Sequence, residues 1–175
     1  GTNSRILQAV SILNEEGLIE PVLLGSKKSV HAKMDKMNLS HLKDISVLQP
    51  EETPKYNDYV LSYFKERQRK GVSFAYSQDV MKSGNYFGSM MVKNGDADGM
   101  ITGATQSYPE CIRPIMKVLG TSDFKRHKVA GIMILIFKSK VIFMADCTVQ
   151  LNPNAEDLAG IAVASAQLFR KVMKA

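Results

Sequence analysis

Two short apolar runs, PVLLG at 21–25 and ISVL at 45–48, most strongly limit the folds open to this chain. Such runs, bounded by glycine or polar residues, are typical of strands buried inside a parallel sheet. Parallel strands need a crossover connection, and the charged segment 26–37 can supply it as a helix. The sequence therefore predicts a strand-helix-strand unit and an α/β fold.

Helical periodicity is found on both sides of this unit. Apolar residues recur at helical spacing over 6–13, and Gly17 ends that segment. The same pattern predicts a helix over 54–70. A further helix is predicted over 76–93, in two pieces broken near Gly84. The first two thirds of the chain should thus contain several helices packed around the parallel strands.

The last third has a different pattern. Two apolar strands, 129–137 and 140–146, follow each other too closely for a crossover, so a hairpin is predicted. A long helix over 153–172 comes next, with Asn152 expected as its cap and Pro153 at its first position.

Two lobes follow from this pattern: a three-layer parallel-sheet lobe over 1–123 and an incomplete second α/β lobe over 124–175. A hairpin and one helix leave apolar surface with little to cover it, and no strand precedes the first helix. We therefore expect a piece of a longer protein, truncated at both ends. Part of the last helix should then be exposed or covered by another chain, on a face formed by Leu158, Ile161, Ala162, Ser165 and Leu168.

Composition excludes several classes of protein. Apolar residues make up 45% of the 175 residues and charged residues 23%, as in globular proteins, and no apolar run approaches bilayer length. With no signal peptide pattern at its start, the chain is predicted to be cytoplasmic and not to bind membranes. Cys111 and Cys147 are interpreted as reduced thiols, with Cys111 a small buried helix residue, and the three histidines are too scattered for a zinc site.

The charge of +6 and the isoelectric point near 9.3 raise the question of nucleic acid. The basic residues lie in separate clusters without a nucleic-acid-binding motif, so we predict no nucleic acid partner. A basic surplus also suits small phosphorylated ligands, whose charge a site must attract and neutralise.

The segment 94–114, NGDADGMITGATQSYPECIRP, contains the richest chemistry. Asn94, Asp96 and Asp98 match the first ligand positions of a calcium-binding EF-hand loop, but the twelfth position, a glutamate in that motif, is Thr105. We therefore predict no metal site, and we assign the two aspartates to a turn. The run GMITG at 99–103 is predicted as a third apolar strand.

Ser107 and Glu110 form the S-x-x-E pattern of a capping box, which places a helix N-terminus at 107–110. Unpaired N–H groups at such an end, behind the small-residue loop that contains Thr105, suit an anion. Arg113 could add a guanidinium. Alternatively, Ser107 only caps its own helix and Arg113 is an ordinary surface residue.

Three linked stretches resemble the phosphate acetyl/butyryltransferase family, in the same order and spacing. They are RILQAVSILNEEGLIEPVLLG near the start, YFGSMMVKNGDADGMITGATQSYPECIRPIMKVLGT in the middle and ADCTVQLNPNAEDLAGIAVASA near the end. Within the family, SYPECIRP followed by LGT most resembles the C-terminal domain of bacterial NADP-dependent malic enzymes. The resemblance covers nearly the whole chain and implies a phosphotransacetylase-like fold.

The resemblance also implies site residues. Arg113 matches the arginine of the family's R-P motif, Arg67 matches a second anion-binding arginine, and Ser107 matches a serine facing the cleft. With Thr105 in the same loop, these residues are the predicted substrate- or anion-binding set; no catalytic residue is assigned. Arg67 also has a simpler explanation, because an arginine at a helix C-terminus stabilises the helix dipole anywhere.

Two functions remain open. The first is a regulatory, acyl-CoA-sensing and homo-oligomerising domain of an NADP-dependent malic enzyme, of which this piece would be inactive alone. Acetyl-CoA or phosphate would be the ligand of the complete domain. NADP and a divalent metal would bind a malic-enzyme domain that is absent here. Supporting it, the serine-arginine and aspartate positions with which the family handles the coenzyme A thiol have no counterpart in this chain. The alternative is part of a catalytic phosphate acetyltransferase, moving acetyl between coenzyme A and phosphate.

Overall fold

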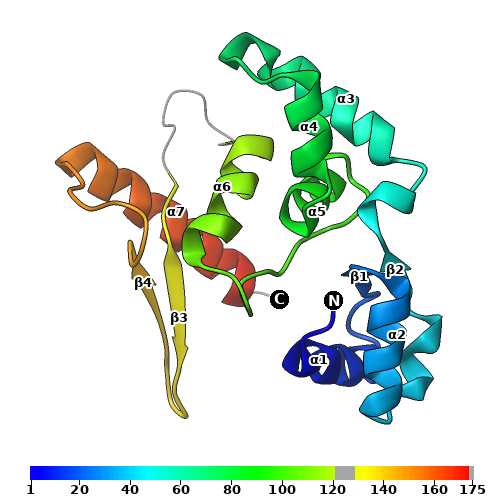
Figure 1. The fold of residues 1–175 in the computed structure, drawn as a ribbon. Helices are drawn as coiled ribbons and strands as arrows, with labels where there is room; N and C mark the ends of the chain where they lie inside the picture. Colours follow the sequence, from blue (N-terminus) through cyan, green and yellow to red (C-terminus); the bar gives the residue numbers. More distant parts are fainter. Residues whose placement is uncertain (121–128, 174–175) are drawn as a thin grey trace. The chain divides into compact units, whose positions relative to one another are not determined.

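The computed structural model describes residues 1–120 and 129–173, which belong to two compact units, Gly1–Gly120 and Thr121–Ala175. Figure 1 shows their helices and strands. The fold is mixed α/β, as the sequence predicts. No helix in the described part of the chain is both long and apolar enough to cross a membrane.

The first unit begins with the predicted strand-helix-strand arrangement. Strand β1 (Val22–Leu24) pairs in parallel with β2 (Ser46–Leu48), and α2 (Lys27–Lys36) forms the crossover, followed by the short η1 (Ser40–Asp44). Helix α1 (Ser4–Glu15) packs on the same core, capped by the Asn3 side chain. This core buries Leu7, Val10 and Leu23, which belong to the predicted apolar runs, together with Val30, Met34 and Leu42.

A group of helices completes this unit, and its bounds agree closely with the predicted periodicity. The elements are η2 (Pro50–Glu52), α3 (Tyr56–Arg67), η3 (Gln68–Lys70), α4 (Phe74–Met81), α5 (Gly84–Lys93) and α6 (Tyr108–Val118). The predicted break near Gly84 is confirmed, because α4 ends before it and α5 starts at it. Helix α5 is the most buried, and its Phe87 and Met90 are almost inaccessible at the centre of this second core.

The predicted third strand at 99–103 is wrong. In the described residues the parallel sheet has two strands, and this segment has no regular structure. Met100 instead packs over Gly88 of α5, where a Cβ atom would lie only 2.6 Å from the Met100 sulfur. Ile101 faces outward and is 89% exposed. A five-residue apolar run does not by itself distinguish a strand from an extended segment lying across a helix.

The second unit contains the predicted hairpin and long helix. Strands β3 (Ile132–Ile136) and β4 (Val141–Ala145) pair antiparallel. Helix α7 (Ala155–Met173) packs on β4, where the rings of Phe143 and Phe169 meet edge-on with 5.1 Å between their centres.

The expected cap of α7 is corrected by the structure. Asn154, and not Asn152, caps this helix: its side chain accepts from Asp157 N, and Asp157 accepts from Asn154 N, both at 2.9 Å. Pro153 therefore lies before the cap. A reciprocal pair of this kind satisfies two backbone donors at once, which explains why the later asparagine is selected.

The predicted apolar face of α7 is exposed only in part. Leu158 is 53% exposed and Leu168 is also accessible, whereas Ile161 is buried. Ala162 is exposed and Ser165 is half-buried. The expected partial exposure of this face is thus confirmed, with Ile161 as its buried residue.

A single carboxylate organises the segment after β4. Asp146 accepts hydrogen bonds from the backbone N–H groups of Gly131, Thr148, Val149 and Gln150, at 2.7 to 3.1 Å. Burial favours the neutral acid, but the four backbone hydrogen bonds outweigh it and lower the pKa of Asp146 to about 2.

Because the folded-state pKa of Asp146 is lowered, its contribution to stability is present above pH 4 and is lost as pH falls towards 2. We expect Asp146→Asn to destabilise this segment by on the order of 1 kcal/mol at pH 7 and to remove that part of the acid sensitivity. Hydrogen exchange of the four bonded amides measures this. Equal protection in both proteins at pH 7 would contradict the assigned role.

Candidate functional site

The predicted capping box at the start of α6 is confirmed. Ser107 is the N-cap, and both its backbone N–H and its hydroxyl donate to Oε2 of Glu110 at 2.8 Å. The hydroxyl and then the backbone hydrogen bond lower the pKa of Glu110. The carboxylate therefore stays charged at neutral pH and is directed at Ser107.

A buried amide joins the preceding loop to two helices. Asn85, in the first turn of α5, donates to Oε1 of Gln106 at 2.9 Å and to the Glu110 carbonyl at 3.0 Å. Its Oδ1 accepts from the Thr102 hydroxyl at 2.7 Å. Asn85 is 6% exposed, so these bonds are shielded from water. Three of its hydrogen-bonding positions are thus used to hold the loop 102–106 and the first turn of α6.

The acidic turn after α5 has a structural role, as the sequence indicates. Asp96 accepts from both Lys55 and the Tyr59 hydroxyl, which ties the turn to the start of α3. The hydrogen bond from Lys55, and then that from Tyr59, lowers the pKa of Asp96. This aspartate is already engaged by protein donors.

The remaining predicted residues of this segment lie on the surface. Thr105 is exposed in the loop before α6, and Arg113 is exposed in the second turn of that helix. Cys111 is buried beneath them, as predicted, and both cysteines of the chain are free. Arg113 and Thr105 are therefore accessible to a ligand.

Arg67, the fourth predicted residue, is the last residue of α3 and is half-buried. Its Nε is buried and has no hydrogen-bond partner among the described residues. Tyr63, one turn earlier on the same face, also has a buried hydroxyl, and its ring meets that of Tyr86 of α5 edge-on, with 5.7 Å between the ring centres. A buried donor such as the Arg67 Nε without an acceptor among the described residues is unusual.

Lys117 joins this group from α6. Its Nζ lies 3.5 Å from the Tyr76 hydroxyl and 5.8 Å from the centre of that ring. Burial raises the pKa of Tyr63 to about 12, while the positive charges of Lys117 and Arg67 oppose the rise. Both cations thus lie near the same phenol. Lys117 follows Arg113 by four residues, so the two share one face of α6.

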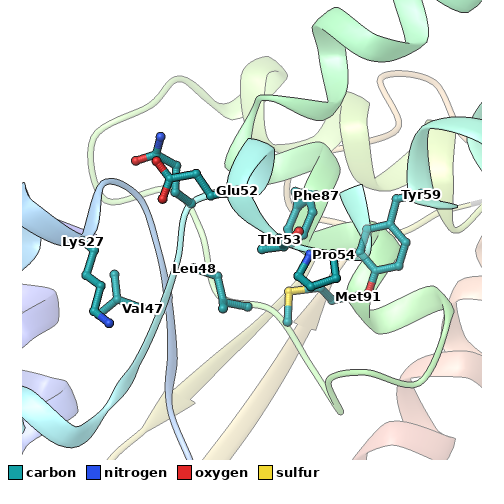
Figure 2. Close-up of a pocket in the computed structure, with 10 residues that line it drawn as sticks. Lys27, Val47, Leu48, Glu52, Thr53, Pro54, Tyr59, Phe87 and Met91 are labelled. Atoms are coloured by element: carbon teal, nitrogen blue, oxygen red, sulfur yellow. The ribbon is translucent and has the colours of Figure 1, made fainter. Parts of the chain in front are cut away.

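A separate cavity of about 290 Å³ lies at the carboxyl end of β2 (Figure 2). Its walls are mostly apolar, with Leu48, Phe87 and Met91 lining it and the charged Lys27 and Glu52 beside it. Ligands of open α/β sheets commonly bind at this edge. The cavity is lined by none of the four predicted site residues.

The structure thus places Ser107 and Thr105 together at the start of α6 and Arg67 at the end of α3, where Arg67 and Lys117 both lie near Tyr63. Asn85 and Lys117 were not among the residues predicted from the sequence. A polar residue inside the apolar run of α5 was a signal for the first, and helical spacing from Arg113 was a signal for the second. In the described residues no three His, Cys, Asp or Glu side chains gather as a possible metal site.

The fold and this cluster of cations define an α/β protein with a basic, accessible helix face. The chain belongs to the phosphate acetyl/butyryltransferase family: the family profile described as Phosphate acetyl/butaryl transferase matches residues 1–175. A phosphotransacetylase from Streptococcus pyogenes has a similar structure, with a TM-score of 0.81 and 29% identity, over 92% of this chain and 49% of that one.

Two relatives show the range of proteins that contain such a sequence. A phosphate acetyltransferase of Nitratidesulfovibrio vulgaris is 34% identical over 170 residues, covering 97% of this chain and 24% of that protein. An NAD-dependent malic enzyme of Rhizobium meliloti is 29% identical over 177 residues, covering 98% of this chain and 22% of that protein. The chain therefore spans about a quarter of the length of these two relatives.

We predict that Asn85→Ala loosens the loop 102–106 and the start of α6, because the Thr102 hydroxyl and the Glu110 carbonyl each lose a partner. The expected loss of stability is about 1–3 kcal/mol, measured by urea unfolding. Hydrogen exchange should accelerate at the first turn of α6.

Asn94→Ala is the matched control for this substitution. Among the described residues the Asn94 side chain donates only to the Met90 carbonyl at the end of the same helix, at 2.8 Å. It should leave exchange at the start of α6 unchanged. Equal effects of the two substitutions there would contradict the role given to Asn85.

Proposed function

We propose that the protein containing this chain is a phosphate acetyltransferase, which converts acetyl-CoA and inorganic phosphate into acetyl phosphate and coenzyme A. The family match over residues 1–175 carries the proposal, and the N. vulgaris phosphate acetyltransferase supports it. The solved Streptococcus pyogenes phosphotransacetylase adds the same fold. This reading was the alternative in the sequence analysis and now has better support than the regulatory one.

In this proposal Arg67 and Arg113 hold the phosphate-bearing substrates. Guanidinium groups suit phosphate oxygens because they offer parallel N–H donors and a charge that does not titrate. The unpartnered Nε of Arg67 is a donor available for such an acceptor. Ser107 and Thr105 lie at the entrance to α6, where Thr105 is exposed, whereas the backbone N–H and hydroxyl of Ser107 already donate to Glu110.

The chemical step needs further groups. The sulfur of coenzyme A leaves as a thiolate or takes a proton, and the carbonyl oxygen of acetyl gains negative charge while phosphate attacks. We assign neither task to a residue of this chain. Its contribution is to bind and orient the anionic reactants, which lowers the entropic cost of bringing them together.

The regulatory reading remains a second proposal because of one observation, the malic enzyme of R. meliloti. In that case the same arginines would sense acyl-CoA and a homo-oligomer would transmit the signal to a malate-decarboxylating domain. The relative is NAD-dependent, whereas NADP was predicted from the sequence as the cofactor of the absent domain.

The test measures thiol release from acetyl-CoA in the presence of phosphate, using the full-length protein. Arg113→Ala and Arg67→Ala should each lower kcat/KM by roughly 10-fold or more, since one charge-assisted contact contributes about 1.5–3 kcal/mol. Arg69→Ala, an exposed arginine two residues from Arg67, is the control and should stay near the wild-type rate.

Absence of thiol release from the well-folded full-length protein would overturn the acetyltransferase proposal. Malate-dependent reduction of NAD or NADP that responds to acetyl-CoA would then favour the regulatory reading. Thiol release that is insensitive to both arginine substitutions would keep the activity and remove the site assignment.

A further inference from the structure

The buried side chain of Asn85 fixes the orientation of a second amide, that of Gln106. A backbone carbonyl can only accept a hydrogen bond, so the Asn85 group that lies 3.0 Å from the Glu110 carbonyl must be its NH2. The same NH2 lies 2.9 Å from Oε1 of Gln106. The Oδ1 of Asn85 accepts from Thr102, which agrees with this orientation. Both N–H bonds of the Asn85 amide are therefore used.

Gln106 must in consequence turn its oxygen towards the protein. The NH2 group of Asn85 needs an acceptor, and Oε1 of Gln106 also lies 3.5 Å from the Thr102 hydroxyl. The reverse orientation would bring two NH2 groups together. The Nε2 of Gln106 is left with two N–H donors, which form no hydrogen bond within the described residues, and the residue is exposed. Gln106 thus presents neutral donors at the surface of the loop.

The burial of Asn85 distinguishes Gln106 from an ordinary exposed glutamine. Asn85 is 6% exposed, so its bond to Gln106 is shielded from water on one side. A glutamine side chain that becomes ordered on binding loses rotamer freedom worth up to about 1.5–2 kcal/mol. Gln106 is held before any ligand arrives, which reduces that loss. Gln8 on α1 is also exposed, but its side chain forms no hydrogen bond in the described part of the chain.

The groups beside Gln106 indicate the chemistry of a ligand. The Thr105 side chain is exposed in the same loop, whereas the backbone N–H and hydroxyl of Ser107 already donate to Glu110. The donors available here are therefore neutral side-chain groups rather than N–H groups of the helix end. Several donors on one short loop suit a ligand with several acceptor oxygens in a small space. A tetrahedral oxyanion such as phosphate has this property, and a lone carbonyl does not.

We propose that Gln106 is a further substrate-binding residue, whose amide donates to an oxygen of inorganic phosphate. Asn85 is its positioning residue and acts from the buried side of the loop. A neutral amide adds direction to the contact without adding charge. The inference rests on the proposed function for the identity of the ligand, and on the oriented amide for the site.

Gln106→Glu separates the two sides of this amide. Glutamate keeps an oxygen that accepts from Asn85 and Thr102, so hydrogen exchange at the start of α6 should stay at the wild-type rate. It replaces the outward donor with a negatively charged acceptor. In the full-length protein we expect the KM for phosphate to rise roughly tenfold or more, because the oxyanion loses a donor and meets a like charge. The KM for acetyl-CoA should stay near the wild-type value.

A double-mutant cycle tests the positioning role of Asn85. Asn85→Ala should raise the phosphate KM, because the Gln106 amide is no longer held. In a protein that already carries Gln106→Ala, the same substitution should raise the phosphate KM much less, since residues that act through one contact are not additive. Fully additive effects on this KM would show that Asn85 does not act through Gln106 and would overturn its assignment.

Gln8→Glu is the matched control, because it makes the same chemical change at an exposed site on α1. Both KM values should stay at the wild-type level. A rise in the phosphate KM as large as that of Gln106→Glu would show a general charge effect. An unchanged phosphate KM in Gln106→Glu would show that Gln106 only holds the loop. Either result would overturn the proposal.

Calorimetry with inorganic phosphate separates this inference from the proposed function. Phosphate binding that is weakened by Gln106→Glu, in a full-length protein without thiol release, would support the site and refute the acetyltransferase. Normal thiol release with unchanged phosphate KM and phosphate affinity in Gln106→Glu would do the reverse. A folded protein that neither binds phosphate nor releases thiol would overturn both.

Discussion

The hydrogen bonds of the Asn85 amide hold together the parts of the first unit on which the site depends. They join the start of α5, the loop before α6 and the first turn of α6. A buried amide left without partners is costly, so the loop and the helix must keep their positions for these bonds to form. Because α5 is also the centre of the helical core, the start of α6 is attached to the most buried helix of the unit.

The opposite end of α6 is fixed by a charge. Lys93, at the end of α5, donates to the Val118 carbonyl at 3.0 Å and contacts Glu66 of α3. Lys93 thus donates to a carbonyl at the C-terminus of α6 that has no partner within the helix. It also serves as the counter-ion of Glu66 on α3. With both ends attached to α5, α6 presents its cationic face at a defined place relative to Arg67.

The elements with a strong periodic pattern could be predicted from the sequence. Apolar spacing reflects burial, and it was enough to predict the strands at PVLLG and ISVL and the helices α1 and α3. The run GMITG was misread because packing on Gly88, which lies 11 residues earlier, decides its conformation. The cap of α7 was misplaced for a different reason: Pro153 was taken as the first helical residue, although Asn154 and Asp157 have the spacing of a capping box. The packing of Met100 on Gly88 cannot be predicted from the local pattern of the run GMITG.

The capping box of α6 affects the site through what it does to Glu110. Glu110, Arg113 and Lys117 are spaced by three and four residues, so all three lie towards one face of the helix. At that spacing the carboxylate could pair with Arg113. It turns back instead to the Ser107 backbone and hydroxyl, so the Arg113 guanidinium has no carboxylate partner among the described residues. The helix N-terminus is therefore already compensated by an anion of its own. Affinity for a phosphorylated ligand must come chiefly from the side-chain cations rather than from the helix dipole.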